Sequence, residues 1–152
     1  MPTVKLLKLE HFDSELPHYE TSGAAGADIR ASLPKEMRGE GLTIEPGSRV
    51  LIPTGLAMQI PEGMEVQVRP RSGLSFKTNL LVVNSPGTID CDYRGEVKII
   101  MGNFGDKAHV IEHGERVAQL VLAPVIQASF AVEESLDETK RGAGGFGSTG
   151  KK

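Results

Sequence analysis

Short runs of alternating apolar and polar residues constrain the fold of this chain more than any other feature. Apolar side chains recur at every second position, apart from Gln119, in the runs 50–52, 56–60, 66–68, 97–99 and 117–121. Turn-forming sequences lie between these runs, among them Glu45-Pro46-Gly47, Pro61-Glu62-Gly63, Ser85-Pro86-Gly87 and His113-Gly114. Such patterning is typical of short half-buried strands joined by tight turns. It predicts an all-β domain of the jelly-roll or distorted-barrel kind.

Helical periodicity is nearly absent. The best candidate for a helix is Leu74–Asn79, and Ser72 would then be its N-cap residue. A chain of 152 residues suits one domain with a single core. We expect a β-barrel core over residues 1–135, followed by a flexible C-terminal arm over residues 136–152.

Composition argues against several classes of protein. The formal net charge of −3 opposes broad binding of a nucleic-acid backbone. The lone Cys91 leaves no internal disulfide or cysteine-based zinc site and fits a reducing compartment. The first dozen residues mix acidic and basic side chains without an apolar stretch, so neither a signal peptide nor a membrane span is expected. We therefore expect a cytoplasmic protein with no nucleic-acid and no membrane partner.

A glycine-rich sequence, RGAGGFGSTG, begins at Arg141. Its composition is also that of a flexible tail, which is the alternative interpretation. However, Arg141 can pair with phosphate, Ser148 and Thr149 can donate hydrogen bonds, and Phe146 offers a stacking face. The sequence is not a Walker A loop, because no lysine precedes the hydroxyl residues. We interpret it as a lid that becomes ordered over a phosphorylated ring compound.

The sequence NSPGTIDCDYRGE, which begins at Asn84, combines a Pro-Gly turn with two nearby carboxylates. It predicts a β-hairpin with a polar tip. An ionised aspartate such as Asp90 can act as a general base towards water. The alternative is that Asp90 and Asp92 only cap turns and that Tyr93 only packs.

Three further segments carry groups suited to a phosphorylated ligand. In VRPRSGLSFK, Arg71 offers a guanidinium fork and Ser72-Gly73 offers N–H groups at a helix start, although an ordinary capped helix is equally compatible. In AGADIRAS, Asp28 can approach Mg²⁺ through water or cap a turn. In GERVAQLVL, Gln119 is a buried amide that bonds either to the backbone or to a ligand.

In this order and at these separations, the five segments resemble the five motifs of the homotrimeric dUTP pyrophosphatase (dUTPase) family. The resemblance extends from about Thr21 to Gly150, and the third and fifth motifs are the most specific. Glu115 and Cys91 are small departures from the usual motifs. The resemblance implies a jelly-roll subunit in a homotrimer, with a C-terminal arm that crosses to a neighbour and active sites shared between subunits.

The resemblance also implies a role for individual residues. Asp90 would activate the attacking water, Tyr93 would pack on the deoxyribose and exclude UTP, and Asp28 would contact Mg²⁺ through water. The other implied substrate-binding residues are Arg71, Ser72, Gly73, Asn84, Gly87, Thr88, Ile89, Gln119, Arg141, Phe146, Gly147, Ser148 and Thr149. The implied reaction is Mg²⁺-assisted in-line attack of water on the α-phosphorus, which converts dUTP to dUMP and pyrophosphate. Such a reaction keeps uracil out of DNA and supplies dUMP for thymidylate synthesis.

Three alternatives predict different sequence features. A dCTP deaminase shares the subunit fold and the trimer, but it needs a catalytic glutamate in the nucleobase site and is not expected to carry this lid. A dUTPase-like regulatory binder that has lost catalysis would usually lack the Asp90 equivalent or the lid. Nucleic-acid binding through the tail is opposed by the acidic total and by a tail with one arginine and one aromatic residue.

Overall fold

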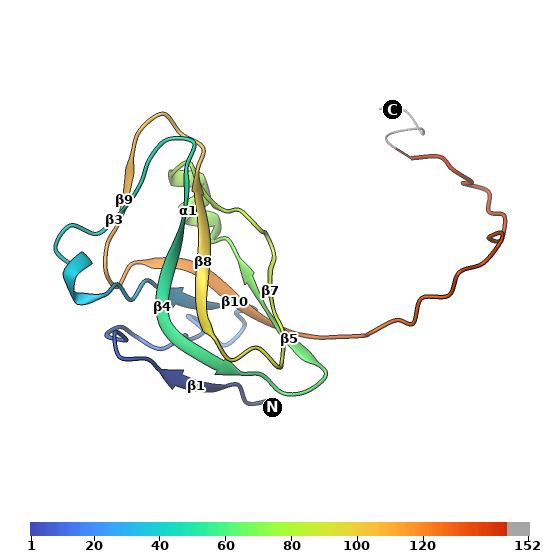
Figure 1. Cartoon of the computed structure of the whole chain (residues 1–152), viewed down its shortest axis with the longest axis horizontal. Coiled ribbons are helices and arrows are strands. Elements are labelled where there is room, and N and C mark those ends of the chain that lie inside the picture. The colour runs from blue at the N-terminus through green and yellow to red at the C-terminus, as the bar shows by residue number, and fades with distance from the viewer. Residues whose placement is uncertain (146–152) are drawn as a thin grey trace.

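The computed structural model describes residues 1–145 and consists of strands with little helix (Figure 1). One sheet has the order β1-β4-β8-β6, a second has the order β2-β10-β5-β7, and β3 pairs with β9 in a separate ribbon. The strands are β1 (Lys5–Lys8), β2 (Ala27–Arg30), β3 (Leu42–Ile44), β4 (Arg49–Gln59), β5 (Met64–Arg69), β6 (Leu80–Val82), β7 (Gly87–Ile89), β8 (Glu96–Asn103), β9 (His109–Ile111) and β10 (Arg116–Pro124). A 3₁₀ turn, η1 (Lys35–Met37), and one α-helix, α1 (Ser72–Lys77), complete the described part of the chain. The predicted all-β fold with one short helix is confirmed.

The hydrophobic core is built mainly from the alternating side chains of both four-stranded sheets, with additions from the β3–β9 ribbon and from the segment after β2. Its most deeply buried large members are Ile29, Leu33, Ile44, Ile52, Leu56, Leu80, Ile99, Met101 and Ile111. Burying one such side chain contributes about 1.5–3 kcal/mol to folding. The core therefore explains why period-two patterning, and not helix propensity, determines this fold.

The runs 50–52 and 56–60 belong mostly to a single bulged strand. The register of β4 against β8 shifts between Pro53 and Ala57. Pro53 has no N–H to donate, and Gly55 has a φ of 66°, which favours glycine. At the bulge, the Thr54 hydroxyl donates to the carbonyl oxygen of Val97 at 2.6 Å. The break in the sequence pattern thus marks a β-bulge, not a turn between two strands.

The helix begins two residues earlier than expected. Ser72 is its first residue, and Arg71 is the N-cap with extended backbone and no capping bond from its side chain, so the expectation of a Ser72 cap is wrong. The helix ends because the backbone of Thr78 is extended. The hydroxyl of Thr78 also donates to the carbonyl oxygen of Leu74 at 2.7 Å. This bond satisfies one of the last helical carbonyls.

The predicted hairpin between residues 84 and 96 is also wrong. β7 pairs with β5 in one sheet, whereas β8 pairs with β4 and β6 in the other. Residues 90–95 therefore connect two sheets instead of closing a hairpin. The physical reason is the register of the apolar side chains, since Ile89 lies opposite Val66 and both are buried in the core.

After Pro124 the chain leaves the body in an extended path (Figure 1). Ile126, Phe130 and Val132 are almost fully exposed there, and all three occupy even positions. In an extended segment, such side chains share one face. None of the helices in residues 1–145 combines the length and the apolar character that crossing a membrane requires.

Candidate active site

A mostly buried carboxylate and two arginines form the first group of site residues, which we call the arginine cluster (Asp28 and Arg71, which were predicted, and Arg116). Arg71 Nε donates to Asp28 Oδ1 at 2.9 Å, and Arg116 Nη1 donates to Asp28 Oδ2 at 3.2 Å. The side chain of Asp28 is only 12% exposed. Arg116 also pairs with the exposed Glu20 at 2.8 Å. Asp28 thus fixes the orientation of both guanidinium groups.

Arg71 keeps free hydrogen-bonding capacity within this cluster. A guanidinium carries five N–H donors. One bond runs from Nε to Asp28 and another from Nη1 to the carbonyl oxygen of Arg116 at 3.3 Å. The adjacent hollow is lined by Arg71, Arg116 and Lys77, together with Glu115 and part of α1. Asp28 and Glu20 partly neutralise the two arginines, but Lys77 and the remaining N–H donors of Arg71 still make this hollow suitable for an anion.

Gln119, on β10, contacts the backbone next to the arginine cluster. Its Nε2 donates to the carbonyl oxygen of Pro70 at 2.8 Å, directly before Arg71. A Cβ added at Gly26 would lie 3.0 Å from Cδ of Gln119, so the glycine makes room for the amide. Of the two interpretations weighed for Gln119, the geometry shows the backbone-bonded amide. Ser72 and Gly73, in the first turn of α1, are both exposed beside this cluster.

The second group is the connection between the two sheets, which we call the Asp90 turn (residues 90–95). Asp90 is exposed and lies at the rim of two hollows. Tyr93, which is 48% exposed, lines one hollow with Asp90, and Cys91 and Asp92 line the other. Within the turn, the N–H of Tyr93 donates to the carbonyl oxygen of Asp90 at 3.2 Å. The carboxylate of Asp90 therefore faces space that a ligand can enter.

Sequence reasoning missed Glu96, the first residue of β8. Its Oε1 accepts hydrogen bonds from His11 Nε2 at 2.8 Å and from the N–H of Gly55 at 2.9 Å. Its Oε2 lies 3.5 Å from Nζ of Lys98. Burial alone would raise the pKa of Glu96, but the bonds from Gly55 and His11 and the charges of His11 and Lys98 together lower this pKa. The only sequence signal was its position as the last residue of the third motif.

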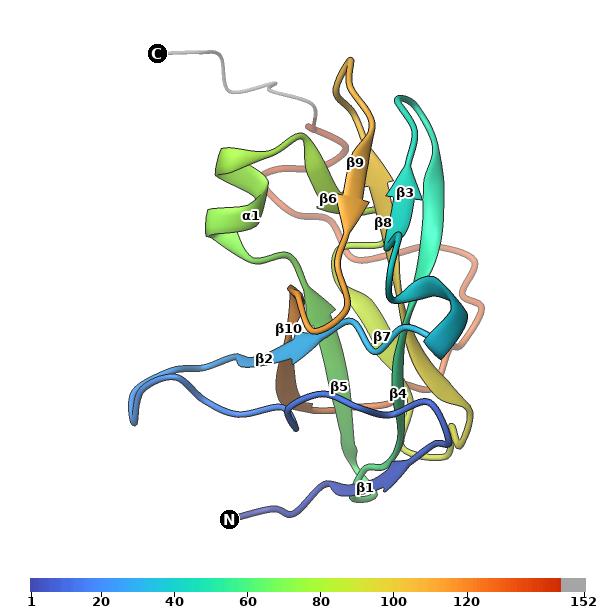
Figure 2. The same ribbon diagram turned by 90° about the vertical axis from the view of Figure 1, so that its left-hand side faces the viewer.

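The arginine cluster and the Asp90 turn lie at opposite ends of β5. Ile89 pairs with Val66, so Asp90 follows at the start of β5, whereas Arg71 lies beyond its end. At about 3.3 Å per residue, the six residue steps from Glu65 to Arg71 span roughly 20 Å. Figure 2 shows α1 near one end of β5 and β1 near the other. Within one chain, the structure does not bring Asp90 and Arg71 into one pocket.

β7, which carries three further predicted residues, lies between these two groups. Gly87, Thr88 and Ile89 form β7, and this strand is at the edge of its sheet. Asn84 precedes it and packs on Gly87, where an added Cβ would lie 2.9 Å from its Nδ2. An edge strand presents unpaired backbone N–H and C=O groups. β7 can therefore hydrogen-bond a ligand through its main chain.

The predicted lid is described only at its beginning. Arg141 is exposed, and its Nε donates to the carbonyl oxygen of Gly144 at 2.8 Å. Phe146, Gly147, Ser148 and Thr149 lie outside the described residues.

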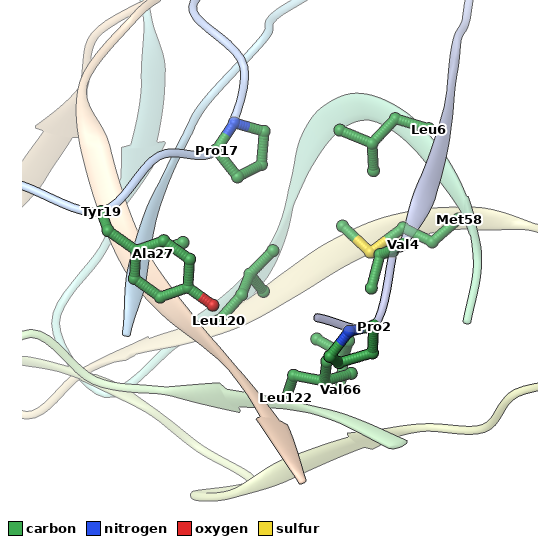
Figure 3. A pocket seen from close by; sticks show the side chains of 10 residues that line it. All are labelled: Pro2, Val4, Leu6, Pro17, Tyr19, Ala27, Met58, Val66, Leu120 and Leu122. Atoms are coloured by element: carbon green, nitrogen blue, oxygen red, sulfur yellow. The ribbon is translucent and has the colours of Figure 1, made fainter. Parts of the chain in front are cut away.

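A further hollow has a different character (Figure 3). Its lining comes from the N-terminal segment, β2, β4, β5 and β10, and it consists of apolar side chains and Tyr19. Val4 and Leu6 lie on one side, with Leu120 and Leu122 of β10 opposite. Such a lining does not suit a triphosphate.

Comparison with known proteins agrees with the motif order. The family model described as dUTPase matches residues 13–150. A deoxyuridine 5′-triphosphate nucleotidohydrolase of Roseobacter denitrificans is 62% identical over 135 residues, covering 89% of this chain and 86% of the relative. The protein of the same name from Rhizobium etli is 55% identical over 150 residues, covering 98% and 94%.

Solved structures show the same fold. The dUTPase of Staphylococcus bacteriophage 80alpha, a mutant studied with dUpNHpp, superimposes with a TM-score of 0.83 at 28% identity, over 97% of this chain and 98% of that one. A mutant dUTPase from phage phi11 of S. aureus, described with a structural Mg(II) ion, has a TM-score of 0.76 at 24% identity, over 90% of this chain and 99% of that one. At that identity, the second likeness shows the fold alone.

The two-sheet fold, the arginine cluster and the Asp90 turn, together with these matches, define an all-β nucleotide hydrolase. The chain belongs to the dUTPase family.

Proposed function

We propose that this protein hydrolyses dUTP to dUMP and pyrophosphate, and thereby keeps uracil out of DNA and supplies dUMP for thymidylate synthesis. The observation that carries the proposal is the Asp90 turn, where an exposed carboxylate and a half-exposed tyrosine line one hollow beside an edge strand. This combination offers a base for water, a platform for the sugar and main-chain groups for a nucleobase. Relatives named as deoxyuridine 5′-triphosphate nucleotidohydrolases support the choice of substrate.

Asp90 is the proposed general base. It would take a proton from a water that attacks the α-phosphorus in line with the leaving pyrophosphate. The negative charge that grows on the phosphate oxygens requires fixed donors. The proposed donors are Arg71 and the N–H groups of Ser72 and Gly73, because Arg71 and Gly73 line the cationic hollow and Ser72 lies between them in the chain. Gln119, whose amide bonds to the carbonyl oxygen of Pro70 directly before Arg71, is a further proposed phosphate contact.

Mg²⁺, when bound, neutralises part of the charge on the triphosphate. Residues 1–145 contain no group of three or more His, Cys, Asp or Glu side chains suited to a metal ion. Phosphate oxygens and water are therefore the proposed ligands, as is usual for Mg²⁺ with nucleotides. A carboxylate has about four lone-pair sites. The two arginine bonds to Asp28 leave room for a water-mediated contact with the ion, so this residue fits that role.

Base selection is proposed to use the main chain of β7, from Gly87 through Thr88 to Ile89, with Asn84 beside it. Uracil presents O4 as an acceptor and N3–H as a donor, whereas cytosine reverses this pattern. A mismatched buried polar group costs about 1–3 kcal/mol. Tyr93 would lie against the deoxyribose, where a 2′-hydroxyl would collide with it.

A homotrimer with shared active sites is the proposed assembly. The separation of roughly 20 Å between Asp90 and Arg71, derived from the strand rise, is too long for one triphosphate to bridge within one chain. A neighbour would then supply the arginine cluster. Ile126, Phe130 and Val132 form an exposed apolar face, and such faces are usually buried against a partner. This exposure supports the proposal that the arm crosses to another subunit.

The lid, the boundary between core and arm near residue 135, and the cytoplasmic location remain predictions. In the proposed reaction, Arg141 contacts the terminal phosphate, Phe146 covers the uracil, and Gly147, Ser148 and Thr149 close on the phosphate chain.

The test is to measure pyrophosphate release with Mg²⁺ from dUTP, dCTP, dTTP and UTP in parallel, with ammonia assayed alongside. Release confined to dUTP is the expected result. Ammonia from dCTP would overturn the proposal in favour of a deaminase. If none of the four nucleotides yields pyrophosphate or ammonia, a regulatory binder would be favoured.

A further inference from the structure

We propose that Glu96 is a positioning residue that holds Tyr93 in place and thereby sets the selectivity of the site for deoxyribose over ribose. The inference rests on the proposed function, because it assigns the sugar contact to Tyr93. It adds Glu96, which lines the same hollow as Asp90 and Tyr93 while its carboxylate is bonded to His11 and Gly55. It also adds a partner, His11, from the N-terminal segment.

Glu96 joins three separate parts of the fold. Its Oε1 accepts from His11 at 2.8 Å and from the N–H of Gly55 at 2.9 Å, and its side chain is only 14% exposed. Gly55 lies in the bulge of β4, where an added Cβ would meet the backbone of Phe12 at 2.9 Å. The carboxylate thus fastens the start of β8 to the bulge and to the N-terminal segment. We call this group the Glu96 clip (Glu96, His11 and Gly55).

The clip connects directly to the ring of Tyr93. The hydroxyl of Tyr93 donates to the backbone carbonyl oxygen of Glu96 at 3.1 Å. The ring lies over Gly95, where an added Cβ would be 2.6 Å from Cζ of Tyr93 and would overlap the hydroxyl. The ring therefore rests on the backbone of Gly95 and Glu96.

Tyr93 needs this support because the core does not supply it. Its side chain is 48% exposed, and the Asp90 turn crosses between two sheets without pairing to a strand along its length. The pairing of β7 with β5 holds the first end of the turn. The Glu96 clip holds the second end. Rejection of a ribose by collision works only if the ring cannot retreat, since a site displaced by about 1 Å loses its discrimination.

The experiment compares kcat/KM for dUTP and UTP in the full-length wild type and in Glu96→Ala, Glu96→Gln and His11→Ala. The expected result is a fall of about tenfold in the dUTP/UTP ratio for Glu96→Ala, with a rise in kcat/KM for UTP. A smaller fall is expected for Glu96→Gln, because its amide oxygen still accepts from Gly55. It also serves as the second variant if Glu96→Ala does not fold. A merely structural role would lower both activities together.

The matched control is His109→Ala. His109 is the first residue of β9, which pairs with β3 in the separate ribbon, and it belongs to neither the Glu96 clip, the Asp90 turn nor the arginine cluster. Its dUTP/UTP ratio is expected to stay at the wild-type value, whereas His11→Ala lowers that ratio.

A double-mutant cycle with Tyr93→Ala tests whether Glu96 acts through the ring. Adding Glu96→Ala to Tyr93→Ala should not lower the ratio further, because the positioned group is gone. Wild-type selectivity in Glu96→Ala, or additive losses in the cycle, would overturn the inference. If the wild type itself does not prefer dUTP, it is the proposed function that fails, so the two failures are distinguishable.

Discussion

The arginine cluster and the Asp90 turn are both composed of predicted motif residues, yet they differ in how they are held. In the arginine cluster, Asp28 is nearly buried and each of its oxygens accepts a guanidinium hydrogen bond. In the Asp90 turn, the carboxylate and the tyrosine face open hollows, and only local bonds and the Glu96 clip fix them. Ion pairs hold the guanidinium groups of the first region in fixed positions. The carboxylate and the tyrosine of the second region stay accessible to a ligand. Substitutions should therefore affect stability in the cluster and chemistry in the turn.

The largest effect is expected for Asp90→Asn. The amide cannot take a proton from water, so turnover of dUTP should fall by about a thousandfold or more while binding persists. Because Asp90 is exposed, the melting temperature should stay near that of the wild type. Single-turnover pyrophosphate release and calorimetric titration with dUpNHpp would measure the two quantities. Near-normal turnover would remove Asp90 from its proposed role.

Removal of the residues after Lys140 should have the next largest effect. The lid would be absent, so turnover should fall by about a hundredfold or more. Within residues 1–145 every strand ends by Pro124, so the fold should persist. Sedimentation velocity should show an intact trimer. A monomer, or undiminished activity, would contradict the proposed lid.

Asp28→Asn should lower the stability of the protein and also impair the reaction, so it tests the contrast between the two regions. Arg71 would lose its ion pair with Asp28 and Arg116 one of its two ion pairs, at a cost of about 2 kcal/mol in unfolding free energy. KM for dUTP should rise by about tenfold, since Arg71 loses its orientation. Urea unfolding and steady-state kinetics would test this. Wild-type stability in this variant would show that the ion pairs of Asp28 do not stabilise the fold.

The smallest expected effect is the pH dependence of stability that arises from Glu96. Its pKa in the folded protein is below its usual value of 4.5. The stability it contributes is therefore fully present above its usual pKa and is lost as the pH falls through the folded-state value. In urea unfolding between pH 7 and pH 3, the free energy of unfolding should fall less steeply with decreasing pH in Glu96→Gln than in the wild type. Glu40→Gln, at an exposed site, should keep the wild-type slope.

Much of the fold was predictable because period-two patterning is local. Runs such as Val66–Val68 and Val97–Ile99 report directly which faces are buried. The pairing of strands was not predictable, since it depends on register between distant segments, and the predicted hairpin after Asn84 failed for this reason. The bulge at Gly55 appeared in the sequence only as a break in the pattern.

The residues of the candidate site were predicted through motif order, but their mutual contacts were not. The bond from Arg71 to Asp28 joins residues that are 43 apart in the chain, and that from His11 to Glu96 joins residues that are 85 apart. Neither pair has a local sequence signature. Glu96 was not predicted because its hydrogen-bond partners, an N-terminal histidine and a backbone N–H in a β-bulge, are distant in the sequence.

The central claim is that one active site needs Asp90 from one subunit and Arg71 from another. Two variants, Asp90→Asn and Arg71→Ala, should each be inactive alone. When they are mixed in equal amounts, unfolded together and refolded, random assembly should leave about a quarter of the sites with both native residues. Recovery of about a quarter of the wild-type dUTP turnover is the predicted result. If the mixed trimers stay as inactive as either parent, Asp90 and Arg71 act within one chain and the account is wrong.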